Sequence, residues 1–537
     1  MFSKIPPGLL VAGAILLGLT AFSVVCALDW MKGRVETSKS SRKAISLGAI
    51  GVGFLVLGFR LWIAEGRVSW APYLDQWHSE IGGIVAPLAH GTLNWRHLTA
   101  ASNEHRVILT RAVTLASVAL NGEWDNRIEV LVTFLLQSAT VAWVSALAWS
   151  AMGWTRGTCV CIAAILPMML VCDWENIVSG FQTQFCFMVL GSIVAFSLST
   201  DFSTRSPAGW GALAIAVLML GSMASGLLTA LTMALTGLIS MFVTRRDWRS
   251  TAGFCAACIA IAAVGWLTRA DYSPGPFLQA QNASACAQAF FAYAAWPLPP
   301  TIAGFICLWM PWGVLLGRTL ARREMPPVAP FVLALGSWVL LQALALAWGR
   351  AGLSGLVGAR YTEVLSWGFV ANTVALLLLW QAPISVGRVR LAAWVILPIW
   401  LAGVGGGELW RSHKIYQPYF TNFRLQTLEH EVRLGAFMRT GDARVITDVK
   451  FPHIPGSAAG ILRSLRDPDV RTLLPAAMRS DQPPSGLSSM QGGPLSLSAI
   501  QALRCGPWFV AGGVSMLFGA VFLALRSAEA ARRNRAA

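Results

Sequence analysis

Charged side chains are scarce in this sequence of 537 residues: Asp, Glu, Lys and Arg make up 12% of it, against about 25% in a water-soluble domain. Hydrophobic residues make up 55%. This balance excludes a soluble enzyme, a disordered scaffold and a nucleic-acid-binding module. The net charge of +16 does not alter the conclusion, because the basic residues stand in short clusters between long apolar runs. That pattern is typical of a protein that crosses a membrane many times.

The motifs of several common enzyme classes are also missing. The sequence has no phosphate loop, dinucleotide fingerprint, Ser-His-Asp order or zinc-protease motif. Most of the ten cysteines lie inside apolar runs, so neither a disulfide framework nor a zinc site is implied. The Cys255-x-x-Cys258 pair has no second ligand pair, and we expect no metal there.

Apolar runs approaching the roughly 20 residues that a bilayer requires predict about thirteen membrane-spanning helices and hence an all-α polytopic membrane protein. The predicted spans are 7–27, 44–64, 128–151, 157–172, 183–199, 209–223, 226–244, 251–268, 299–317, 328–348, 364–382, 391–405 and 507–526. We take the first as a retained helix rather than a signal peptide, because no small-x-small cleavage site precedes the basic loop after it. Lys and Arg occupy every second loop, which places the N-terminus outside.

The chain accordingly divides into four parts. These are an extra N-terminal helix with a basic inner loop (1–43), a transmembrane core (44–405) that includes an outer loop (65–127), an outer domain (406–506), and a last helix with an inner tail (507–537). In the outer domain, 445–449 (VITDV) predicts a short strand, and 457–466 and 470–478 predict short helices, so we expect a small α/β portion.

The two outer segments hold all seven histidines and most carboxylates, so any catalysis is expected on the outer side. Apolar residues spaced i, i+3, i+4, i+7 make 75–90 an amphipathic helix on the membrane surface, and 103–120 a second interfacial helix. Ionisable candidates open both helices: Asp75, His78 and Glu80 in the first, and Glu104, His105 and Arg106 in the second. The alternative is that these are solvated helix starts, with Asp75 and Asn103 as N-caps.

Two short outer loops supply further candidates. The loop 172–184 concentrates Asp173, Glu175, Asn176, Gln182 and Gln184; its two carboxylates suit a divalent cation (Mg²⁺ or Mn²⁺), and the alternative is helix capping. The loop 350–363 keeps Arg350 and Arg360 on the side that positive charge usually avoids. This favours an anion ligand such as a lipid-linked phosphate, with Tyr361 against a sugar; the alternative is an arginine facing lipid headgroups.

This layout resembles the GT-C superfamily of membrane glycosyltransferases. Residues 44–127 match the superfamily's helix leading outward into a first outer loop with two interfacial helices, and Asp75 takes the place of its early catalytic carboxylate. Asp173-x-Glu175 resembles the acidic pair that some members carry in the second outer loop. The extra leading span and the returning helix 507–526 depart from several branches, so the resemblance fixes neither donor nor acceptor sugar.

The resemblance implies a multi-pass protein of the bacterial inner membrane whose active site faces the periplasm. The expected partners are a polyprenyl-phosphate-linked sugar donor, a glycan or lipid acceptor and membrane lipids, with no nucleic acid. Asp75 would act as the general base, and Arg360, with Arg106 or His105, would stabilise the leaving phosphate. Glu80, Asp173 and Glu175 would orient sugar hydroxyls or a cation. Two other functions stay open: a transporter or flippase of lipid-linked sugars, and a polysaccharide polymerase or ligase.

Overall fold

The computed structural model describes residues 39–244, 247–270, 278–353, 357–380, 387–448, 457–479 and 493–536. The predicted span 7–27 lies outside these residues. Within them the chain forms helices joined by loops and no β-strand, and the antiparallel bridge between Ser102 and His105 is isolated.

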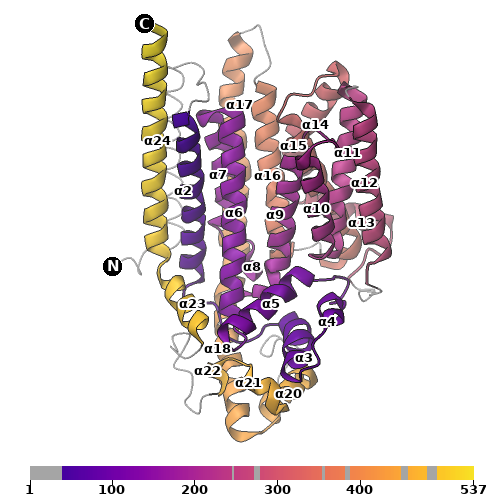
Figure 1. Ribbon diagram of the computed structural model, residues 1–537, viewed down its shortest axis with the longest axis vertical. Coiled ribbons are helices and arrows are strands. Elements are labelled where there is room, and N and C mark those ends of the chain that lie inside the picture. Colours follow the sequence, from indigo (N-terminus) through magenta and orange to yellow (C-terminus); the bar gives the residue numbers. More distant parts are fainter. Residues whose placement is uncertain are drawn as a thin grey trace.

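A bundle of long helices makes up most of the molecule (Figure 1). Its members are α2 (Lys39–Ala64), α6 (Asn126–Met152), α7 (Trp154–Met168), α9 (Thr183–Leu198), α10 (Pro207–Leu220), α11 (Leu227–Thr244), α12 (Trp248–Leu267), α13 (Ala283–Ala294), α14 (Ile302–Arg322), α15 (Ala329–Gly349), α16 (Ala359–Trp380), α17 (Gly387–Arg411) and α24 (Gly506–Ala536). Nine helices of the described chain are long and apolar enough to cross a membrane, whereas α7 and α10 are shorter apolar helices. The protein is therefore a helical multi-pass membrane protein.

The last helix packs against the first described one through glycines. On α2 and α24, Gly51 and Gly58, and Gly506 and Gly513, are each seven residues apart, so they line one face of each helix. A Cβ atom at Gly513 would lie 2.6 Å from the backbone nitrogen of Leu55. The two backbones therefore touch, as in membrane helix pairs that meet through small residues, and Figure 1 shows α24 alongside α2 over the length of α2.

Two segments far apart in sequence form a cap at one end of the bundle (Figure 1). The first contributes η2 (Trp77–Val85), α3 (Ala86–Ala89), α4 (Trp95–Thr99) and α5 (Ile108–Asn121). The second contributes α18 (Gln417–Thr440), α19 (Arg444–Thr447), α20 (Ala458–Arg466), α21 (Pro468–Thr472), α22 (Ala476–Arg479) and α23 (Pro494–Arg504). Together these elements are called the cap below.

The amphipathic face predicted for 75–90 is buried by protein rather than by lipid. Ile81, Ile84 and Val85 have no exposed surface, and Ile81 and Val85 share a hydrophobic core with Ile461 and Leu474 of the second cap segment. The expectation of a helix lying on the membrane surface is therefore corrected. The i, i+3, i+4, i+7 spacing in 75–90 correctly identified an apolar face. An apolar face can be buried by lipid or by protein, and here α20 packs against it.

The strand predicted at 445–449 is wrong for the described residues 445–448, and residue 449 lies outside the described residues. Residues 444–447 form α19, and Asp442 starts this turn by accepting a hydrogen bond from the Arg444 backbone nitrogen at 3.0 Å. Ile446 is fully buried in the cap core. A short apolar run fits a buried helical turn as well as a strand, and the Asp ahead of it favours the turn.

Candidate functional site

Asp75 lies at the seam between the cap and the bundle, two residues before η2, and is partly exposed. Its charge interacts with those of His105 and Arg360, although the three residues come from segments far apart in sequence. Neither Asp75 nor Asn103 is a helix N-cap, because η2 is preceded by Gln76 and α5 by Val107. The capping alternative therefore does not explain why Asp75 stands here.

Arg360 enters the same region from the first turn of α16. Its Nε lies 3.0 Å from Oε2 of Glu175, which is carried by α8 (Trp174–Val178). The guanidinium also lies 5.7 Å from the centre of the Tyr361 ring, a cation–π distance. Since Glu175 contacts Nε, the terminal nitrogens of the fork can still donate to an anion.

A second arginine reaches the site from the end of α15. Arg350 forms an ion pair with Oε1 of Glu104, and Nε2 of His105 lies 3.6 Å from the same oxygen. Burial raises the pKa of the Glu104 carboxyl, but its interactions with His105 and with the Arg350 guanidinium outweigh it, so the pKa lies below its usual value. Glu104 is therefore an anion at neutral pH, and its Oε2 is buried without a hydrogen-bond partner.

His105 is held as a neutral ring with a defined tautomer. Burial lowers its pKa, and the charges of Arg350 and Arg360 lower it further, whereas Glu104 raises it. Its Nδ1 accepts a hydrogen bond from the Ala224 backbone nitrogen at 3.3 Å. The proton of the neutral ring is therefore on Nε2, which faces Glu104.

The junction cluster is the name used below for these six residues: Asp75, Glu104, His105, Glu175, Arg350 and Arg360. It holds three partly exposed acidic side chains, a neutral imidazole and two guanidinium groups, which include the groups needed to take a proton from a hydroxyl and to hold a phosphate. Tyr73 lies beside it and was missed from sequence, because a lone Tyr before a helix carries no recognisable pattern. Burial and the nearby charge of Glu175 raise the pKa of its hydroxyl, so Tyr73 stays neutral.

Four other predicted residues lie away from the junction cluster or are committed elsewhere. His78 is exposed on η2, and Gln182 is buried in the turn before α9. Arg106 donates to the backbone carbonyls of Thr99 (2.6 Å) and Thr268 (2.8 Å), which links the turn before α5 to the end of α12. Glu80 is the fourth and belongs to the core.

Glu80 is fully buried beside Glu129 of α6. Its Oε2 accepts hydrogen bonds from Gln76 and from the indole nitrogen of Trp124, both at 3.1 Å. Burial raises the pKa of Glu80, and the neighbouring Glu129 raises it further. The Glu80 carboxyl is therefore protonated and joins the cap to the bundle rather than orienting a sugar.

The two carboxylates expected to face one divalent cation point to different arginines. Asp173 forms a two-point ion pair with Arg60 of α2, at 2.6 and 3.0 Å, whereas Glu175 contacts Arg360. The side chains one residue apart diverge because the short helix α8 begins between them. In the described geometry they therefore offer a metal no free pair of carboxylates.

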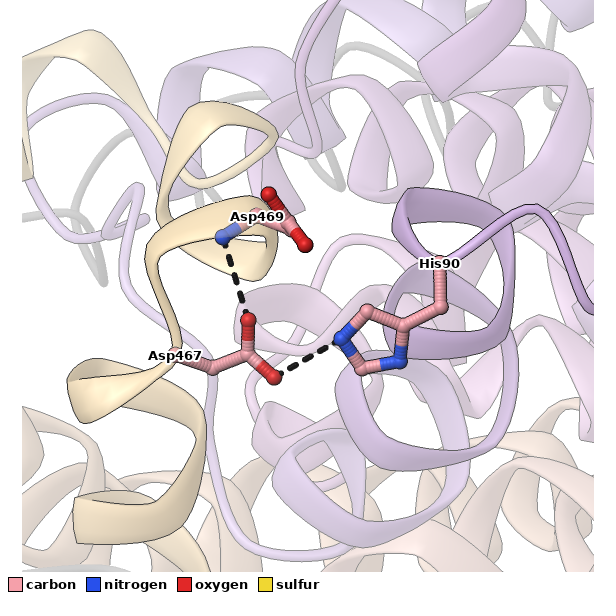
Figure 2. Close-up of side chains that lie close together, drawn as sticks. All are labelled: His90, Asp467 and Asp469. Atoms are coloured by element: carbon pink, nitrogen blue, oxygen red, sulfur yellow. Dashed lines mark hydrogen bonds and ion pairs between the residues drawn. The ribbon is translucent and has the colours of Figure 1, made fainter.

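Potential metal ligands do meet on the cap surface. His90, Asp467 and Asp469 place one ligand atom each within 4.8 Å of one another, and Figure 2 shows them reaching across from the two cap segments. Nε2 of His90 lies 2.9 Å from Oδ2 of Asp467, whose Oδ1 accepts from the backbone nitrogens of Asp469 and Val470. These contacts account for Asp467 as a helix cap and as an ion-pair partner that holds the cap segments together.

In comparisons with known proteins, neither a family model nor a curated protein matches the chain. The function therefore has to be argued from the junction cluster and its surroundings.

Proposed function

We propose that the protein is a glycosyltransferase of the bacterial inner membrane that moves a sugar from a polyprenyl-phosphate donor to an envelope glycan or lipid. The proposal includes about thirteen spans and a cap that faces the periplasm. The observation that carries it is that Asp75, His105 and Arg360, which lie on three separate segments, come close enough for their charges to interact. The GT-C resemblance pointed to Asp75, and the ionisable groups of the same outer loop pointed to His105.

In the proposed reaction Asp75 takes the proton of an acceptor hydroxyl as its oxygen forms a bond to the anomeric carbon. The bond from that carbon to the phosphate oxygen breaks, and its electron pair leaves with the polyprenyl phosphate. Arg360 and Arg350 stabilise the charge that develops on this leaving group. His105, held neutral, adds no positive charge that would compete for the Asp75 carboxylate.

The carboxylates beside the two arginines keep those side chains in place. Glu175 and Glu104 hold Arg360 and Arg350 before a donor arrives, so little side-chain freedom is lost when a phosphate binds. A divalent cation, Mg²⁺ or Mn²⁺, remains a prediction from the acidic pair Asp173 and Glu175. Because both carboxylates face arginines, the proposed phosphate contacts are made by guanidinium groups and do not require it.

The decisive variant is Asp75→Asn, which keeps the shape of the side chain and removes the base. We expect it to lower transfer by roughly 10²–10⁴-fold with the protein still folded in the membrane. The assay is mass spectrometry of envelope glycans from cells with and without the gene, which names the added sugar, followed by transfer of that sugar from its lipid donor by protein in nanodiscs. Asp201→Asn, at an exposed position in the loop between α9 and α10, is the matched control. Unchanged transfer by Asp75→Asn would sink the assignment.

A transporter of lipid-linked sugar is the second candidate, and one observation favours it. Ionisable side chains occur inside the bundle, on α2, α16 and α17, where carriers often bind coupling ions. A vesicle assay separates the two functions, since a carrier moves labelled lipid across the bilayer without changing its mass. A transferase changes the mass of the acceptor.

A further inference from the structure

A polar network crosses the bundle interior beneath the junction cluster. Arg60 of α2 pairs with Asp173, and Gln137 of α6 donates to Oε2 of Glu363 on α16 at 2.9 Å. Asn176 of α8 donates to the same oxygen at 2.8 Å. All five residues are at least 96% buried as whole residues.

A third buried carboxyl group adjoins this network from α17. Oε1 of Glu408 accepts a hydrogen bond from Ser366 at 2.8 Å, whereas Oε2 is buried with no hydrogen-bond partner among the described atoms. Asp173 is close enough to interact electrostatically with both Glu408 and Glu363. The three carboxyl groups therefore form one electrostatic unit.

The charges of this unit do not balance. Asp173, Glu363 and Glu408 carry three negative charges when ionised, and Arg60 supplies one positive charge. The next guanidinium, that of Arg411, is bound to the carbonyls of Pro297 and Leu298 at 2.6 and 2.8 Å. An excess of two negative charges in a dry interior is strongly unfavourable, so the unit must take up positive charge.

Unused oxygen atoms near this unit could accept such a charge. The side-chain oxygens of Gln137 and Asn176, like Oε2 of Glu408, are buried and have no hydrogen-bond partner in the part of the chain that the structure describes. The side-chain nitrogens of the first two already donate to Glu363, so their oxygens are the free end of each amide. Oxygen ligands around a carboxylate suit a small hard cation.

We propose that Glu363 and Glu408, beside Asp173 and the amides of Gln137 and Asn176, take up a small cation, either a proton or a sodium ion. The site lies directly below the junction cluster. Asn176 follows Glu175 and also donates to the Arg360 carbonyl at 3.3 Å, and Glu363 is one turn after Arg360. Cation occupancy thus sets the position of the Glu175–Arg360 pair, whichever reaction that pair serves.

The first test is the thermal unfolding of the purified full chain in detergent, followed by tryptophan fluorescence. Sodium chloride is replaced stepwise by choline chloride at constant ionic strength, and bound radioactive sodium is counted. If sodium is the ligand, the unfolding midpoint rises with sodium concentration, and one ion binds per chain. Glu408→Gln and Glu363→Gln lose both effects, and Glu65→Gln, at an exposed position, keeps them.

The second test is infrared difference spectroscopy of the same protein between acid and alkaline buffer. If protons are the ligand, sodium has no effect, and wild type shows the carbonyl band of a buried protonated carboxyl group that shifts in heavy water. Glu408→Gln or Glu363→Gln loses the component of that band that its own carboxyl group contributes, while the components from Glu80 and Glu431 stay. The proposal would be overturned if unfolding did not depend on sodium and the infrared spectra of wild type and both variants were identical. The sodium titration and the infrared spectrum of wild type do not depend on how the variants fold, and neither requires sugar transfer.

Discussion

Replacing Glu431 by Gln should change the pH dependence of cap stability. Glu431 lies on α18, is 1% exposed, and accepts a hydrogen bond from the Ser69 hydroxyl at 2.6 Å. Burial raises the pKa of its carboxyl from 4.5 to about 7, although the Ser69 hydrogen bond and the charge of Arg127 oppose the shift. The residue therefore joins the second cap segment to the loop after α2 as a neutral acid.

The raised pKa of Glu431 determines whether the protein gains or loses stability as the pH rises. Between pH 4.5 and about 7 the folded protein keeps a proton on Glu431 that the unfolded chain releases, so the free energy of unfolding falls as pH rises. At about 1.4 kcal/mol per pH unit, the loss amounts to about 3 kcal/mol and is complete above pH 7. Glu431→Gln cannot ionise, so it avoids this loss and should be more stable than wild type at pH 8 but not at pH 4.5.

His430, next to Glu431, changes the stability with pH in the opposite direction, so its contribution has to be separated from that of Glu431. Burial lowers the pKa of His430 from 6.5 to about 4, so this ring destabilises the fold as pH falls between those values. Its contribution is the same in wild type and in Glu431→Gln and cancels in their difference. The assay is the unfolding midpoint of both proteins from pH 4.5 to 8.5, together with protease cleavage of the cap. A difference that does not change with pH would refute the assigned protonation state.

Three further outcomes are expected. Gly513→Leu drives a side chain into the α2 backbone, so it should lower the free energy of unfolding by about 3 kcal/mol or lower the yield of folded protein. Gly512→Leu is the control, because the space at its Cβ is open, and it should leave the thermal unfolding midpoint unchanged. Arg60→Ala leaves Asp173 buried without its partner and should cost about 3–5 kcal/mol, part of which Asp173→Asn in the same chain restores. Chelation by EDTA should leave sugar transfer unchanged, because Asp173 and Glu175 already face arginines; a large loss restored by Mg²⁺ or Mn²⁺ would show the opposite.

The sequence allowed the helical membrane fold to be predicted because that fold depends on composition along single segments. Apolar runs indicated helices, and nine described helices meet the length and apolarity of a span. The same reasoning predicted that 75–90 is helical, but it did not predict what this helix packs against. Nothing within the segment indicates that Ile461 packs on it. Pairings across several hundred residues are tertiary information, which periodicity does not contain.

The candidate site shows the same limit residue by residue. Asp75, His105 and Arg360 were singled out because they are ionisable groups in outer loops, and the structure brings their charges together. Glu363 and Glu408 were missed, because each is a single acid at the end of an apolar run and reads as a helix terminus. Glu80 stood out in sequence for its charge, yet it is buried and paired with another carboxyl group.

The seam between cap and bundle is built largely from acids that stay protonated. Glu80 meets Glu129 there, and Glu431 meets Ser69, so both cap segments are attached through carboxyl groups whose pKa burial raises. Ionising either one would bury a charge that has no ion-pair partner among the described residues, whereas Asp125 at the same seam is paired with Arg127 at 2.6 Å. Raising the pH from 4.5 to about 7 should therefore loosen the cap before it affects the apolar bundle, and Asp75, carried on the first cap segment, would move with the cap away from Arg360. Activity should then fall over this pH range through cap opening, and Glu431→Gln should reduce that fall without changing the reacting groups.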